Sequence, residues 1–164
     1  MRGKDMHTDG RHDFDPLHGH WSVRHRRLRQ RLAGCTDWDS FAGTSSMQPL
    51  LGGLGNVDDN VIMLPAGEYR AATLRAFDVG RRQWSIWWLD ARTPGHIEAP
   101  MVGRFEGADG VFYADEDFAG RPIRVRFLWL HTRSATPRWE QAFSTDRGLT
   151  WETNWEMDFA RDFT

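Results

Sequence analysis

The sequence lacks the features on which several classes of protein depend. Its 164 residues include one cysteine, Cys35, so no disulfide bond can form within the chain. No stretch approaches the ~20 apolar residues of a membrane-spanning helix, and none resembles the apolar region of a signal peptide. Neither sign of charge dominates, because 21 Lys and Arg residues are balanced by 23 Asp and Glu residues. These absences predict a soluble, cytoplasmic protein that binds neither membranes nor nucleic acid.

One basic run, RHRRLRQR at residues 24–31, interrupts this balance. On a strand its arginines would divide between the two faces, so they would not form one stripe that follows a phosphate backbone. We therefore interpret the run as a strand that extends beyond its sheet, where both faces are solvated.

The segment FSTDRGLTWETNW, residues 143–155, matches the Asp-box pattern S-x-D-x-G-x-T-W. In β-propellers such a motif usually returns once per blade, and at least four blades of four strands are needed. The chain contains the pattern once and is too short, which excludes a propeller. The local interpretation is a hairpin clasp, in which Asp146 accepts hydrogen bonds from turn amides and Gly148 supplies a positive φ.

The chain has no long segment with the 3.6-residue period of a helix. Short runs of alternating polarity are instead separated by Gly, Pro and Asp, as in antiparallel β-proteins. We expect strands near residues 20–32, 37–48, 56–64, 68–78, 82–90, 101–106, 110–118, 122–132, 137–145 and 150–160.

These sequential hairpins predict an all-β fold, a single antiparallel up-and-down β-barrel of about 8–10 strands, because closure removes exposed edges. Residues 14–164 would form this domain, with a short turn or helix at FDPLHG, and residues 1–13 a flexible tail. Alternation by itself also suits a β-sandwich. The face that carries most of the tryptophans, Trp21, Trp129, Trp139, Trp151 and Trp155, would point inward.

Several segments resemble a known group of barrels. Gly19-His20-Trp21 is similar to the Gly-x-Trp element of lipocalins and other calycins, in which the Trp closes the barrel floor and a late basic residue, here Arg161, packs across it. Together with YRAATLRAFD and WSIWWLDAR, these residues resemble a bacterial family of calycin-like domains of uncharacterised function. The resemblance implies a barrel around a pocket and no particular activity.

Aromatic side chains on the inner face can line a pocket for a small apolar or aromatic molecule, or they can pack into a solid core. Polar side chains of the same parity would anchor such a ligand, and the alternative is that they pair near the rim. The predicted ligand-binding residues are Arg27, Trp87, Trp88, Trp129, His131, Trp139, Gln141 and Trp155.

An enzyme is the alternative, for instance a cofactor-independent cyclase or isomerase. If Val57 and Val61 face inward, Asp59 lies inside the barrel with a raised pKa, and His25 completes an acid–base pair. The competing interpretation is a bulged strand whose Asp and Asn side chains satisfy local amides. Haem binding ranks lower, because only His131 comes near the position of the haem ligand in calycin relatives.

We expect no metal and no cofactor. His18 and His20 lack a third ligand at a zinc-like interval, and YADEDFAG lacks the spacing of a calcium loop. A structural or partner-binding module also fits the sequence, either as a monomer or as a homodimer.

Overall fold

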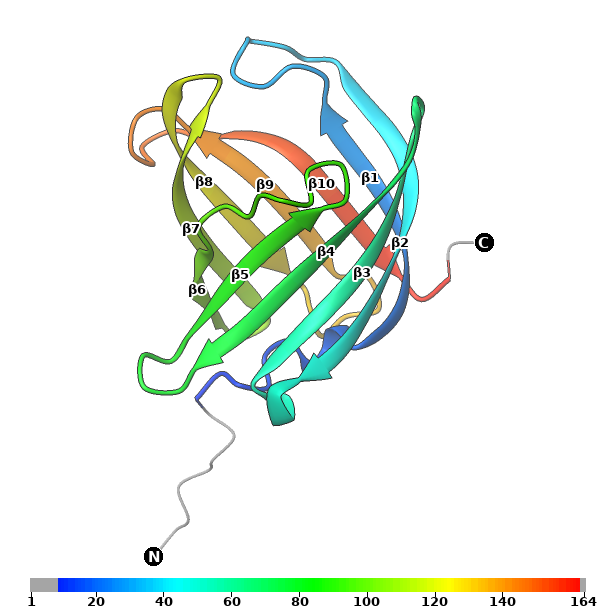
Figure 1. The fold of residues 1–164 in the computed structure, drawn as a ribbon, viewed down its shortest axis with the longest axis vertical. Coiled ribbons are helices and arrows are strands. Elements are labelled where there is room, and N and C mark those ends of the chain that lie inside the picture. The colour runs from blue at the N-terminus through cyan, green and yellow to red at the C-terminus, as the bar shows by residue number, and fades with distance from the viewer. Residues whose placement is uncertain (1–8, 163–164) are drawn as a thin grey trace, which may run out of the picture.

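The chain folds into a closed barrel of ten antiparallel strands (Figure 1). The computed structural model describes residues 9–162. Each strand pairs with its neighbours in sequence, and β1 pairs with β10 to close the cylinder, which confirms the up-and-down barrel and excludes the sandwich. The strands are β1 Gly19–Leu28, β2 Trp38–Leu50, β3 Gly55–Leu64, β4 Gly67–Asp78, β5 Gln83–Asp90, β6 Met101–Glu106, β7 Asp109–Phe118, β8 Arg121–Leu130, β9 Arg138–Ser144 and β10 Glu152–Ala160.

All ten predicted strands are present, and the main difference is the end of β1. This strand stops at Leu28, and Leu32 adopts a positive φ of 58°, so the chain turns instead of continuing as a solvated strand. The Arg31 guanidinium lies 5.3 Å from the centre of the Phe118 ring. The basic run therefore bends back over the barrel end.

Helical structure in residues 9–162 consists of two short 3-10 turns, η1 Asp15–Leu17 and η2 Leu51–Gly53. Neither is long enough to cross a lipid bilayer.

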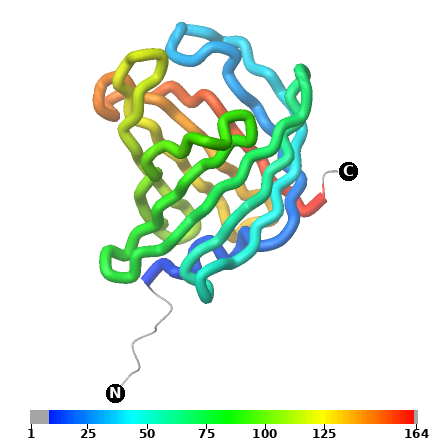
Figure 2. Tube along the Cα trace, in the orientation of Figure 1, coloured from blue at the N-terminus to red at the C-terminus, as the bar shows by residue number. Residues whose placement is uncertain are grey.

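The segment before β1 closes one end of the barrel, where Figure 2 shows it in blue beneath the strands. Phe14 is fully buried, and its ring lies edge-on to Trp84 and Phe105 at 4.8 and 4.9 Å. The carbonyl of Gly10 accepts a hydrogen bond from Trp84 Nε1. Residues 9–13 thus pack on the barrel instead of forming a loose tail, and residues 1–8 of the predicted tail lie outside the described residues.

The Gly-x-Trp element closes the same end, as the resemblance implied. Trp21 is buried, donates from Nε1 to the carbonyl of Leu17, and is covered by Arg161 at 3.5 Å from the ring centre. Gly19 has a φ of 103°, and a Cβ atom there would lie 2.9 Å from Arg161 Nη1. Glycine is favoured at this position because its positive φ is a conformation that other residues rarely adopt, and it also leaves room for the end of the Arg161 side chain.

The Asp box is a hairpin clasp, as predicted. Ser144 Oγ donates to Asp146, and the carboxylate accepts hydrogen bonds from both the backbone amide and the hydroxyl of Thr150. These hydrogen bonds, those from Thr150 first, lower the pKa of Asp146 to about 2. The motif joins β9 to β10 and has a structural role.

The expected inward position of Trp151 is wrong. A β-bulge in β10 lies between Thr153 and Trp155, and it reverses the alternation of the side chains before it. Trp151 instead lies on the outside, with the Arg126 guanidinium 4.5 Å from its ring centre.

Candidate functional site

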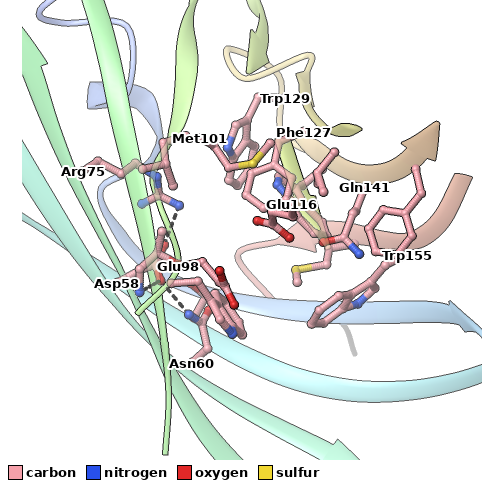
Figure 3. A pocket seen from close by; sticks show the side chains of 18 of the residues that line it. Asp58, Asn60, Arg75, Glu98, Met101, Glu116, Phe127, Trp129, Gln141 and Trp155 are labelled. Carbon is pink, nitrogen blue, oxygen red and sulfur yellow. Dashed lines mark hydrogen bonds and ion pairs between the residues drawn. The ribbon is translucent and has the colours of Figure 1, made fainter. Parts of the chain in front are cut away.

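The barrel encloses a cavity of about 190 Å³ (Figure 3). Its wall is mainly aromatic and aliphatic, with one polar side formed by β3 and β4. Figure 3 shows Asp58, Asn60 and Arg75 on one side and Trp129, Phe127, Gln141 and Trp155 on the other. The aromatic lining residues are Trp88, Phe127, Trp129, Trp139, Phe143, Trp155 and Phe159.

The floor of the cavity packs against Phe14, in the segment that closes this end of the barrel. The Arg75 guanidinium lies 4.9 Å from the centre of the Phe14 ring and 5.8 Å from that of Trp129. Phe14 and Trp129 themselves meet edge to face at 6.2 Å. A charged group therefore lies between aromatic rings at the closed end.

The charge of Arg75 is balanced by a buried carboxylate. Arg75 Nη2 forms an ion pair with Asp58 Oδ2 at 2.8 Å, and Nη1 donates to Asn56 Oδ1 at 2.9 Å. The other oxygen of Asp58 accepts hydrogen bonds from Asn60 Nδ2 at 2.6 Å and from the amide of Thr73 at 3.1 Å. Both carboxylate oxygens are thus satisfied, as a buried charge requires.

The expected inward position of Asp59 is wrong. On β3 the polar set Asn56, Asp58 and Asn60 faces the interior, while Asp59 points outward and forms an ion pair with Arg70 at 2.7 Å. Asp59 points outward because Asp58 and Asn60 form buried hydrogen bonds and an ion pair with β4. These interactions stabilise the observed orientation of β3 more than burial of Val57 and Val61 would stabilise the opposite one.

Two glutamates lie at the open end. Glu98 lines the cavity from the loop between β5 and β6, and Glu116 lines it from β7. Glu98 is largely exposed and is bonded to His96 Nε2 at 2.7 Å. Burial, and secondly the charge of Glu98, raises the pKa of Glu116. The rim therefore carries two acidic side chains, and Arg27 and Arg31 lie at the same end of the barrel outside the cavity lining.

Five of the eight predicted ligand-binding residues line the cavity: Trp88, Trp129, Trp139, Gln141 and Trp155.

The other three lie outside the lining. Trp87 points outward, opposite Leu74, because neighbouring Trp88 takes the inner face. His131 is exposed, because β8 ends at Leu130 and the chain then turns with a φ of 54°. His131 therefore provides no haem ligand inside the barrel. Arg27 lies above the cavity, 5.4 Å from the centre of the Trp155 ring.

His25 faces inward but does not line the cavity. Its ring is stacked on Phe41 at 4.8 Å, and its Nδ1 accepts a hydrogen bond from Trp155 Nε1 at 3.1 Å. Burial, and secondly the charge of Arg27, lowers the pKa of His25 to about 4. His25 is therefore neutral at pH 7 and holds the Trp155 indole. It does not meet Asp59, so the predicted acid–base pair is not formed.

Sequence reasoning missed the Asp58–Arg75 pair, Phe14 and the two rim glutamates. One signal was available for Arg75, since it shares the parity of Tyr69 and Phe77 on β4 and so had to face inward with them.

The fold is a closed ten-stranded up-and-down barrel with calycin-like topology. No protein-family model matches the chain, and no curated protein matches it. Among solved structures, the chain is similar to the S-type phycobiliprotein lyase CPES from Guillardia theta, with a TM-score of 0.58 and 10% sequence identity over 92% of this chain and 91% of that chain. At this identity the likeness concerns the fold alone, and the resemblance to an uncharacterised bacterial calycin-like family stays a prediction.

Proposed function

We propose that the protein binds a small, mainly apolar molecule inside the barrel. The supporting observation is the cavity itself, whose walls are mainly aromatic and aliphatic. It has one polar side on β3 and β4, with Gln141 opposite and two glutamates at the rim (Figure 3). Burying apolar surface against such walls is the main source of affinity in a preformed pocket.

The size of the cavity indicates the size of the ligand. Its volume of about 190 Å³ exceeds the roughly 150 Å³ of a cavity that holds benzene in another protein, but it is below the roughly 300 Å³ at which drug-sized pockets begin. A molecule with one aromatic or alicyclic ring fits this range without movement of the walls.

An enzyme is not favoured by the geometry. Asp59 is outside, His25 is outside the cavity lining, and both oxygens of Asp58 are occupied. The similar solved structure is that of a lyase, but the likeness in fold transfers no activity.

Toluene provides a direct test by isothermal titration calorimetry. We expect saturable binding with one site per chain, and an at least tenfold loss of affinity in Val125→Phe, because Val125 is buried in the cavity wall and a larger side chain fills the space. Val111→Phe is the matched control, since Val111 lies on the adjacent strand next to inward-facing Phe112 and itself points outward.

Circular dichroism should show that both variants fold, since overpacking costs about 1–3 kcal/mol. Absence of saturable toluene binding by the wild-type protein, or equal affinity in the two variants, would contradict the proposal.

A further inference from the structure

Two buried nitrogen donors in the cavity wall have no acceptor in residues 9–162: Trp129 Nε1 and Arg75 Nε. Both residues line the cavity, and they are only 4% and 3% exposed. A buried donor without a partner costs about 1–3 kcal/mol. Both nitrogen atoms are themselves buried, so an acceptor that enters the cavity reaches them only after a small movement of the wall, and it would then gain a favourable interaction at the floor.

Trp129 differs in this respect from three other buried tryptophans of the barrel, Trp21, Trp84 and Trp155. Trp21 donates to the carbonyl of Leu17, Trp84 to the carbonyl of Gly10, and Trp155 to His25. Their indole nitrogens all have an acceptor within the protein, whereas Trp129 Nε1 is buried without one.

Arg75 is held in place by its other two nitrogens. The hydrogen bond to Asn56 and the ion pair with Asp58 fix the guanidinium plane, so Nε is not free to turn toward another group of the protein. The Arg75 guanidinium carbon lies 5.8 Å from the centre of the Trp129 ring, so the two residues belong to the same part of the wall.

The electrostatics of the cavity favour an uncharged acceptor. The positive charge of Arg75 is already neutralised by Asp58, Glu98 and Glu116 stand toward the rim, and the arginines of that end, Arg27 and Arg31, lie outside the cavity lining. A carboxylate would have to approach these three acidic side chains without a free counter-charge in the cavity lining. A carbonyl oxygen accepts two hydrogen bonds at no such cost.

The geometry points to a ligand that is uncharged, has one apolar ring and carries a carbonyl-type oxygen, which accepts hydrogen bonds from Trp129 Nε1 and Arg75 Nε. This inference rests on the proposed function and adds the chemical class of the ligand. Trp129 and Arg75 would then favour a ligand with a carbonyl oxygen over one of the same shape without it, which aromatic walls alone would not do.

The test compares two probes of nearly equal shape, acetophenone and α-methylstyrene, in which a carbonyl oxygen is replaced by a methylene group. Binding of each is measured by calorimetry to the wild-type protein and to Trp129→Phe, which retains an aromatic ring but removes the donor. We expect the ratio of acetophenone to α-methylstyrene affinity to fall about three- to tenfold in this variant, as the loss of one hydrogen bond predicts.

Trp155→Phe is the matched control. Trp155 lines the same cavity, but its donor is already bonded to His25. This variant is expected to weaken both probes to a similar extent and to leave the ratio unchanged.

The outcomes separate the two proposals. If neither probe nor toluene binds the wild-type protein, the proposed function fails, and the inference fails with it. If both probes bind but Trp129→Phe leaves their ratio unchanged, binding stands and the inference is overturned. Tighter binding of benzoate than of acetophenone would overturn the requirement for an uncharged ligand.

A second measurement needs no variant. In the wild-type complex, the infrared carbonyl stretch of bound acetophenone should lie at a lower frequency than in hexane, because hydrogen bonding weakens the carbonyl bond. A frequency equal to that in hexane would show an unbonded carbonyl and would overturn the inference even if Trp129→Phe did not fold.

Discussion

Replacement of Asp58 by alanine is expected to lower the free energy of unfolding by about 3–5 kcal/mol. The substitution leaves the Arg75 guanidinium buried between Phe14 and Trp129 without its counter-charge. It also removes the acceptor of the Thr73 amide and one of the two acceptors of Asn60 Nδ2, which keeps the carbonyl of Ala71. Urea denaturation followed by circular dichroism measures the change.

The neighbouring residue provides a matched control. Asp59→Ala removes a carboxylate from the same strand and breaks an ion pair with Arg70, but both side chains are exposed, so the free energy of unfolding should stay near that of the wild type. The double variant Asp58→Leu/Arg75→Met removes both buried charges and is expected to recover most of the stability lost in Asp58→Ala. Equal effects of Asp58→Ala and Asp59→Ala would show that the interior pair is not a buried ion pair.

Acidification is expected to destabilise the fold through His25. The pKa of this imidazole is about 4 in the folded protein and 6.5 in the unfolded chain. Between these pH values the unfolded chain therefore binds a proton that the folded protein excludes. The contribution of neutral His25 to the free energy of unfolding is fully present above pH 6.5 and is lost as the pH falls toward 4. Its full size is about 3 kcal/mol, because the difference between a pKa of 6.5 and one of about 4 corresponds to about 1.36 kcal/mol for each pH unit.

Carboxylates also titrate at low pH, so the contribution of His25 is obtained as the difference in the free energy of unfolding between the wild type and His25→Gln at each pH. The free energy of unfolding of His25→Gln should be lower than that of the wild type at pH 7.5, and the difference should narrow as the pH approaches 4. His131→Gln serves as the control, since His131 is exposed and its curve should run parallel to the wild type. A constant difference between His25→Gln and the wild type would contradict a buried neutral imidazole.

The strands of the barrel and their order could be predicted because they depend on features of short, contiguous stretches of the sequence. Alternation with period 2 identifies strands, and turn residues between them fix the order of hairpins. The closing contact was also predictable, since Gly19, Trp21 and Arg161 form the arrangement that the calycin resemblance implied.

The interior of β3 could not be predicted in the same way. In NVDDNV, burial of the valines and burial of Asn56, Asp58 and Asn60 are both consistent with alternation, and hydrophobicity favours the wrong choice. The polar set faces inward because Arg75 and the Thr73 amide on β4 supply its partners, and this pairing is a tertiary contact. Trp151 was misplaced for a similar reason, since a bulge reverses alternation without a distinctive residue to mark it.

A crystal structure determined under xenon pressure tests the central claim most directly, because xenon enters dry apolar cavities without needing a specific contact. The cavity bounded by Trp129, Trp139 and Trp155 should contain a xenon atom, and the surrounding side chains should stay in place. A barrel interior that admits no xenon because side chains fill it would contradict the account.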